Sequence, residues 1–519
     1  MASALRGGSG AELALFSRLN RHGLLQEIEQ RQAQLASLPG PQQALAAELR
    51  GLTQQLAALT LSSEQRQQLS GRQQALERQL YRLLPQLRPR IVEVLQVAAA
   101  LPAGSALIEF QLYRPLDGTK PAKQRWGQAR YLALVLKPNG DVTSVDLGLA
   151  SPIDERIQTA LQATEQVEER APQLWSELGN VLLEPLAPAI RGVHTLFLSP
   201  DGQLNRVPFA ALPAPGSGQL LADAFQLRLL TTGRELLDLQ TRVSSPATQP
   251  LILANPSFDQ QQRDTPNRVA PQRRAPDLAR LHWSPLPGTI SEGKAVAALT
   301  GARLLTQSEA TAVAVQQQQA PRILHIASHA FYLEDQPASD AAEGALNRGG
   351  LGVQPLSSGQ RPAPARSAIG GDPLLRSGIA LAGANTSQAS TSDDGYLTAL
   401  EVARLNWKGT ELVVISACES GNGEIQAGEG VYGLKRAIAV AGARSSLLSL
   451  WKVDDLATAA FMESLYSRLM AGAGRADALA ATQSEFRRHA TTEWRHPYVW
   501  AAFQLSGDWE RLGPAPGSD

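Results

Sequence analysis

The segment Glu411-Leu-Val-Val-Ile-Ser-Ala-Cys418-Glu-Ser-Gly421 decides the interpretation of this chain of 519 residues. Its short run of apolar, mostly β-branched residues predicts a buried strand of a parallel sheet. The small and turn-forming residues from Ser416 to Gly423 predict where that strand ends. In open α/β sheets, ligands bind beyond the carboxyl ends of the strands. Cys418, the one cysteine of the chain, is therefore expected where a functional site is usually found.

A histidine stands at the corresponding place in a second predicted strand. The run Arg322-Ile-Leu-His-Ile-Ala-Ser-His329 is short and apolar, and it ends in small residues. If the two strands are neighbours in a parallel sheet, both side chains emerge at one edge. A nucleophilic thiol needs a base or a lowered pKa, so we predict a His329/Cys418 dyad. The alternative is that Cys418 is a small buried apolar residue.

His325 lies four residues before His329, inside the predicted strand. The spacing His-x-x-x-His suggests zinc, but that motif needs a helix and an intervening Glu. Here Ile326, Ala327 and Ser328 intervene. We therefore expect His325 to be a buried, hydrogen-bonded residue, and we expect no metal.

The composition excludes several classes of protein. The chain has 48 basic and 48 acidic side chains, so nothing indicates a nucleic-acid partner, and 43% of its residues are hydrophobic, enough for sizeable cores. One cysteine cannot form an intrachain disulfide. We find neither a signal peptide at Met1 nor an apolar run long enough to span a bilayer. We expect a cytoplasmic protein with no membrane partner.

The pattern along the chain predicts three parts. Residues 1–98 are a helical region, a hairpin or short bundle, because leucines at 45–59 and 69–87 repeat with spacings of three and four. These helices either pack on the next domain or bind a partner. Residues 99–245 form a non-catalytic α/β companion subdomain with a strand at Ser105–Tyr113 and a helix near 152–186. Residues 246–512 form the catalytic domain, in which 335–376 is expected to gate the cleft.

Several motifs together resemble the bacterial CHAT domain, a caspase-like family often found with tetratricopeptide repeats. They occur in the family's order and spacing: His325–Ala330, Pro373–Asn385, Asp394–Val402, Ser416–Gly421, Gly428–Gly433, Leu450–Asp455 and His496–Phe503. The resemblance implies an α/β fold of the caspase–hemoglobinase type, with a mostly parallel sheet flanked by helices. It also implies a catalytic His329/Cys418 dyad. The family commonly has Gly after the histidine, where this chain has Ala330, which would be strained at a positive φ.

The function that we expect from the resemblance is that of a cysteine endopeptidase acting on protein or peptide substrates. The backbone N–H groups of Ala330 and Cys418 would bind the oxyanion. Asp454 and Asp455 are candidate S1 residues for a basic P1 side chain, although one of them is expected to cap the helix Leu456–Met470. Ser416 stands where metacaspases carry an Asp. No cofactor is needed, and a protein regulator or activator is a further expected partner.

Two other functions fit the same residues. The first is a non-catalytic, caspase-like signalling scaffold or interaction module, because of Ala330 and the helical region at 1–98. The second is an acyltransferase, since the same dyad can pass an acyl group to an acceptor other than water.

Overall fold

The computed structural model describes residues 10–22, 90–121, 124–240, 247–259, 281–332, 377–386, 394–416 and 427–513, with single positions between 44 and 79. For residues 427–432 it describes the backbone alone. The leucine repeats at 45–59 and 69–87, apart from those single positions, lie outside these residues. So do the 335–376 segment, the boundary expected at 245/246 and Cys418.

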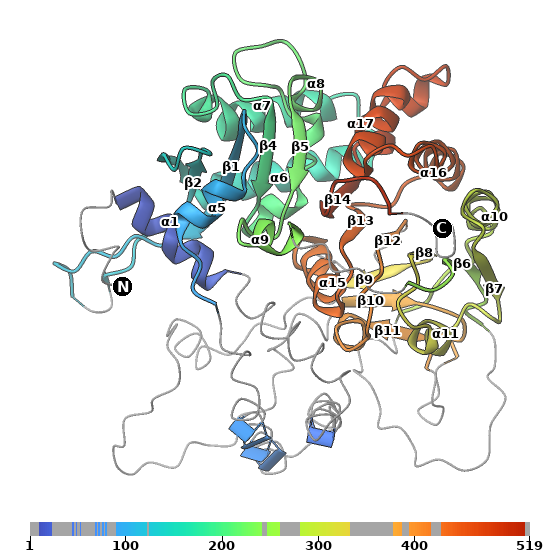
Figure 1. Ribbon diagram of the computed structural model, residues 1–519. Coiled ribbons are helices and arrows are strands. Elements are labelled where there is room, and N and C mark those ends of the chain that lie inside the picture. Colours follow the sequence, from blue (N-terminus) through green and yellow to red (C-terminus); the bar gives the residue numbers. More distant parts are fainter. Residues whose placement is uncertain are drawn as a thin grey trace.

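Eleven of the described strands form one sheet with the order β3-β2-β1-β4-β5-β14-β13-β12-β8-β6-β7. The first part of the chain contributes β1 (Ser105–Tyr113), β2 (Arg130–Leu136), β3 (Val142–Leu149), β4 (Thr195–Ser199) and β5 (Gln226–Leu229). The second part contributes β6 (Leu251–Pro256), β7 (Arg303–Gln307), β8 (Ile323–Ala327), β12 (Leu412–Ile415), β13 (Ser445–Ser449) and β14 (Phe503–Gly507). Figure 1 shows β1, β4 and β5 beside β14 and β13.

The two parts of the sheet run in opposite directions. Strands β1, β4, β5 and β14 are parallel to one another, and β13, β12, β8, β6 and β7 form a second parallel set. The sets meet where β13 and β14 pair antiparallel. The carboxyl ends of β1 and β4 therefore lie at the edge opposite to that of β8 and β12.

Helices cover both faces of the sheet, which is why its central strands are buried on both sides. One face carries α6 (Ala150–Glu165), α7 (Ala171–Leu183), α10 (Thr289–Thr300), α16 (Asp455–Met470) and α17 (Arg475–Phe486). The other face carries α1 (Gly10–Arg21), α5 (Val94–Ala100), α9 (Glu235–Leu239), α11 (Ala312–Gln317), α14 (Ala399–Val402) and α15 (Ala427–Ala441). The predicted class, an α/β fold with a mostly parallel sheet flanked by helices, is confirmed.

Shorter elements complete the described chain. A second sheet has the order β11-β10-β9, with β9 (Ala330–Tyr332), β10 (Ser377–Ala380) and β11 (Tyr396–Thr398). Two short α-helices are α8 (Leu221–Ala224) and α18 (Pro497–Trp500). The 3-10 helices are η3 (Glu184–Leu186), η4 (Gly202–Arg206), η5 (Phe209–Ala211) and η7 (Thr492–Arg495). Within the described part of the chain, no helix combines the length and the apolar character needed to cross a bilayer.

The helix predicted near 152–186 is in fact two helices, α6 and α7. Val167 has a φ of 55°, a left-handed conformation that cannot continue a right-handed helix. Pro172 then stands in the first turn of α7, where its missing N–H is tolerated. The strand predicted at Ser105–Tyr113 has the same bounds as β1.

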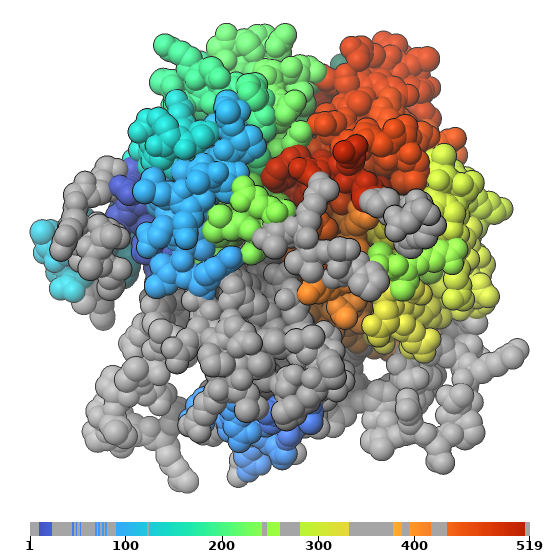
Figure 2. Space-filling view, in the orientation of Figure 1, coloured from blue at the N-terminus to red at the C-terminus, as the bar shows by residue number. Residues whose placement is uncertain are grey.

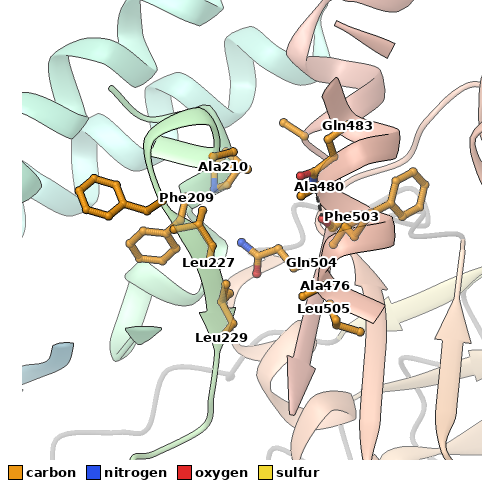
Figure 3. A pocket seen from close by; sticks show the side chains of 15 residues that line it. Phe209, Ala210, Leu227, Leu229, Ala476, Ala480, Gln483, Phe503, Gln504 and Leu505 are labelled. Carbon is orange, nitrogen blue, oxygen red and sulfur yellow. Dashed lines mark hydrogen bonds between the residues drawn. The ribbon is translucent and has the colours of Figure 1, made fainter. Parts of the chain in front are cut away.

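The two halves join at a seam between β5 and β14 that has little backbone pairing. The register of the two strands consists of one pair, Leu229 with Ser506. Side chains fill the rest: a pocket of about 50 Å³ is lined by Leu227 and Leu229 on one side and by Ala476 and Ala480 on the other, and Figure 3 shows Gln504 between them. One apolar core extends through both halves on this face, and Figure 2 shows the halves in contact over the face on view. Because the two halves share this core, the division into domains at 98/99 and 245/246 remains a proposal.

Candidate active site

His329 lies two residues beyond the end of β8, at a point where the backbone passes from the main sheet to the small sheet. The Ser328 hydroxyl donates to the Ala380 carbonyl at 2.6 Å, and the Ala380 N–H donates to the His329 carbonyl at 2.9 Å. These two hydrogen bonds connect the end of β8 to the end of β10. The position of the His329 backbone is thus fixed from both sheets.

The imidazole of His329 is buried, with 1% of the residue exposed. Its Nε2 lies 2.8 Å from the carbonyl oxygen of Ser284. A carbonyl oxygen accepts hydrogen bonds and cannot donate them, so Nε2 carries a proton. In the neutral ring the lone pair is then on Nδ1. Nδ1 is the nitrogen that can accept a proton from a nucleophile.

Aromatic rings enclose the imidazole. The ring centroid of Phe258 is 5.1 Å from that of His329, and the centroid of Trp283 is 5.3 Å away. Phe331 and Tyr396 belong to the same buried cluster, in which their rings meet edge to face at 5.6 Å. We call Phe258, Trp283, Phe331 and Tyr396 the aromatic collar. It restricts the rotation of the His329 ring.

Cys418 lies outside the described residues, but the strand before it is described. β12 pairs with β8 in parallel, with Ile415 opposite Ile326, and Ser416 N–H donates to the Ile326 carbonyl at 3.2 Å. The same sequence offset separates Ile326 from Ile415 and His329 from Cys418. The strands that precede the two dyad residues are therefore neighbours, as predicted, while the dyad itself stays a prediction.

Ala330 is the first residue of β9, at the edge of the small sheet. It is opposite Ile379, and Ala380 N–H bonds to the carbonyl before Ala330. In an antiparallel ladder this pattern makes Ala330 and Ile379 a non-hydrogen-bonded pair. The N–H of Ala330 consequently points away from β10. Its strand backbone also avoids the positive φ at which alanine would be strained.

Asp454 and Asp455 have different surroundings. The Asp454 carboxylate accepts hydrogen bonds at 3.0 Å from the N–H groups of Leu456 and Ala457, so Asp454 is the N-cap of α16. Asp455 is half-buried beside Gly288, where an added Cβ would lie 2.4 Å from the Asp455 Cβ. Their S1 role remains untested.

The electrostatics of Asp455 connect it to the histidine. Burial raises the pKa of the Asp455 carboxyl above its ordinary value, whereas the nearby Lys452 and, more weakly, His329 act to lower it. Leu456, the next residue, is 69% exposed. Asp455 therefore interacts electrostatically with His329.

His325 has the environment that the sequence predicted. It is fully buried, with Nε2 3.0 Å from a carboxylate oxygen of Glu292 and Nδ1 3.1 Å from the Tyr466 hydroxyl. Both contacts are satisfied when Nε2 donates to Glu292 and Tyr466 donates to Nδ1. Burial raises the pKa of Tyr466 well above its ordinary value. Among the described residues, no group of three acidic, histidine or cysteine side chains could hold a metal ion.

Sequence reasoning missed Ser284, Phe258 and Trp283 as neighbours of His329. Ser284 contributes a backbone carbonyl, which has no signature in side-chain chemistry. The two aromatic residues flank a Gln/Arg/Pro-rich stretch, and a large apolar residue at each end of a polar segment was the available signal.

Comparison with known proteins agrees with this architecture. The site belongs to a mixed α/β protein in which His329 lies beyond β8, the parallel neighbour of β12. The CHAT domain family matches residues 172–508, more than half of the chain. The chain therefore belongs to the CHAT domain family, as its motifs predicted. The match begins in α7, so it includes β4 and β5 as well as the second half.

Two curated relatives share part of this sequence. Tetratricopeptide repeat protein 28 of Homo sapiens is 26% identical over 327 residues, which are 60% of this chain and 12% of the relative. The Mus musculus protein of the same name is 26% identical over 330 residues, again 60% of this chain and 12% of the relative. The matched region is thus a small part of those longer proteins.

Solved structures give weaker likenesses. A Saccharomyces cerevisiae separase–securin complex has a TM-score of 0.43 at 9% identity, covering 96% of this chain and 39% of that chain. The complex of Porphyromonas gingivalis RgpB pro- and mature domains has a TM-score of 0.32 at 9% identity, covering 70% of this chain and 77% of that chain. At these scores the likenesses carry no argument about function.

Proposed function

We propose that this protein is a caspase-like cysteine endopeptidase with the dyad His329 and Cys418. The observation that carries the proposal is the hydrogen bond from Nε2 of His329 to the Ser284 carbonyl. It leaves the lone pair on Nδ1, in a ring that follows the strand next to β12. A base held in one orientation is what a thiol nucleophile requires.

The reaction would begin when Nδ1 of His329 takes the proton of the Cys418 thiol. The thiolate attacks the scissile carbonyl carbon, and the oxyanion is bound by the N–H groups of Ala330 and Cys418. One such donor contributes about 2.7–4 kcal/mol in a well-studied protease. The imidazolium then protonates the leaving amine as the C–N bond breaks. Water hydrolyses the thioester by the reverse proton transfers, which yields a carboxylate and the free thiol.

The substrate class that we propose is a protein or peptide with a basic P1 residue. Support comes from Asp455, whose half-buried carboxylate lies close enough to His329 to interact with its charge. Arginine is favoured over lysine if it binds the carboxylate bidentately. We propose a cytoplasmic location, because a chain with one cysteine forms no intrachain disulfide and therefore does not need an oxidising compartment.

The decisive test is a pair of single substitutions. Cys418→Ala and His329→Ala should each lower the rate of peptide cleavage by about a thousandfold or more, because the two residues act as one unit. The far-ultraviolet circular dichroism and thermal midpoint of both variants should match those of the original protein. His194→Ala, which changes an exposed histidine of the companion half, is the matched control. Cleavage by Cys418→Ala near the original rate would contradict the proposal.

A second candidate function is a non-catalytic scaffold that binds other proteins. The burial of His329 beneath the aromatic collar favours it, because a substrate must reach the dyad. A thiol-reactive peptide electrophile distinguishes the two. An endopeptidase should be labelled at Cys418, and His329→Ala should slow the labelling. A scaffold would show neither effect.

An acyltransferase with the same dyad is tested separately. Product analysis with added amines distinguishes acyl transfer to the amine from hydrolysis.

A further inference from the structure

Two chain segments converge on His329, and one residue binds both. Phe258 follows β6 in the first segment, and Trp283 precedes α10 in the second. Both rings lie on the imidazole. Asn385, in the turn after β10, contacts both segments through its backbone and its side chain.

The contacts of Asn385 are specific in direction. Its Oδ1 accepts from the Trp283 N–H at 2.8 Å, and its Nδ2 donates to the Trp283 carbonyl at 2.9 Å. The same Nδ2 donates to the Asp259 carboxylate at 2.8 Å, and the backbone N–H of Asn385 donates to the Phe258 carbonyl at 3.0 Å. A backbone N–H only donates and a carbonyl only accepts, so the orientation of the side-chain amide is fixed.

The ring of Trp283 is held as well. Its indole N–H donates to the Tyr396 hydroxyl at 3.1 Å, and that hydroxyl donates to the Ala384 carbonyl at 3.1 Å. Trp283 is fully buried. Both polar groups of the Trp283 backbone are thus bonded to Asn385, and its indole N–H is linked through the Tyr396 hydroxyl to Ala384, the residue before Asn385.

We propose that Asn385 is a positioning residue for His329, acting through the backbone of Trp283 and Ser284. The residue after Trp283 supplies the carbonyl that binds Nε2 of His329. Fixing Trp283 on both sides of its α-carbon fixes where that carbonyl lies. Asn385 thereby sets which imidazole nitrogen carries the proton and how the ring is turned. This inference rests on the proposed function, because it specifies how the base of that site is oriented.

The chain contains a matched control for this contact. Asn20, at the end of α1, holds Val92 in the same way: its Oδ1 accepts from the Val92 N–H and its Nδ2 donates to the Val92 carbonyl, both at 2.8 Å. Asn20→Ala and Asn385→Ala therefore remove the same kind of contact at two places. Only the second touches the segment that bears Ser284.

The experiment measures both the hydrogen bond and the reaction. In protein labelled with ¹⁵N-histidine, the Nε2–H proton of His329 should give a slowly exchanging resonance, identified by its loss in His329→Ala. That resonance should vanish or broaden in Asn385→Ala and persist in Asn20→Ala. With peptide substrate, kcat of Asn385→Ala should fall about tenfold or more, with KM changed less than about twofold, since the contact orients a catalytic group. Asn20→Ala should keep kcat.

A second pair of variants guards against loss of folding. Asn385→Asp keeps the acceptor for the Trp283 N–H but places a carboxylate beside Asp259. Adding Asp259→Asn restores a donor at that contact, while the Trp283 carbonyl still faces an acceptor, so the double variant should regain only part of the kcat lost in Asn385→Asp. A retained His329 resonance and unchanged kcat in Asn385→Ala would overturn the inference. If the original protein cleaves no peptide, the proposed function fails, and the resonance alone decides whether Asn385 positions His329.

Discussion

The carboxyl ends of the parallel strands are closed differently in the two halves of the molecule. In the companion half, the parallel pairing of β1 with β4 ends at Glu109, opposite Ser199, and Glu109 is a fully buried carboxylate. Arg18 of α1 reaches it at 3.1 Å and also binds Asp201, which follows β4, at 3.0 Å. In the second half, β8 ends near His329, whose bonded nitrogen faces a neutral carbonyl.

This difference contrasts a strand end that is closed by opposite charges with one whose ionisable side chain is held by a neutral partner. Opposite charges at the first site fix each other, and Glu109 is further bound by the Thr232 hydroxyl at 3.1 Å. Both carboxylate oxygens of Glu109 are thus bonded within the fold. At His329 a neutral backbone carbonyl holds the ring at Nε2. A neutral hydrogen-bond partner thus orients an ionisable side chain without forming an ion pair with it.

The largest effect on stability is expected from breaking the ionic closure. Arg18→Ala would leave the Glu109 carboxylate buried without its cation, which costs about 3–5 kcal/mol in the free energy of unfolding. Urea denaturation measures the loss. Arg130→Ala, which breaks an exposed pair with Asp146, should cost about 0–1 kcal/mol. Equal losses in the two variants would contradict the buried role. The double variant Arg18→Met/Glu109→Gln, which removes both charges, should be more stable than Arg18→Ala. Its cleavage rate per folded molecule should equal that of the original protein.

The same closure should make stability depend on pH. Burial lowers the pKa of His22 from 6.5 to about 4, and the charge of Arg18 acts in the same direction, while Asp201 and Glu109 oppose it. Between these two values the unfolded chain binds the proton and the folded chain does not. The free energy of unfolding should therefore fall, by about 3 kcal/mol at most, as the pH drops from about 6.5 to about 4.

Denaturation curves of His22→Gln at several pH values check this expectation. The variant should lose that part of the pH dependence and keep the part that comes from the carboxylates. A pH profile identical to that of the original protein would mean that the pKa of His22 does not change on folding.

The smallest of these effects concerns specificity at the other strand end. Asp455→Ala should lower kcat/KM for an arginine at P1 about tenfold, with little change for an uncharged P1. Asp454→Ala should leave this ratio unchanged and cost about 1 kcal/mol of stability, because Asp454 caps α16. A library of peptides that differ at P1 provides the measurement. Cleavage after acidic or uncharged residues, unaffected by either substitution, would exclude an acidic S1 pocket.

The sequence predicted what depends on local pattern. Apolar runs gave β1, β8 and β12, and their small-residue ends placed His329 and Cys418 beyond neighbouring strands. The partners of those residues were not predictable in this way. Glu292 and Tyr466 are 33 and 141 residues from His325, and Asn385 is 102 residues from Trp283. Contacts between a side chain and a backbone group far away in the sequence depend on how the elements pack. Such packing produces no periodic pattern of residues from which the contacts could be predicted.

The seam between β5 and β14 also has a mechanical meaning. Neighbouring strands elsewhere in the sheet are joined by several register pairs, as in β13 and β14, whereas β5 and β14 share one. Backbone ladders resist shear because many hydrogen bonds must break together, and apolar side-chain contacts yield one after another. A load that pulls the halves apart would therefore act on packed side chains such as Leu227 and Phe503 before it reached any ladder. The order of strands is continuous across the sheet, but between β5 and β14 the two halves are held together mainly by side-chain packing, as at an interface between two domains.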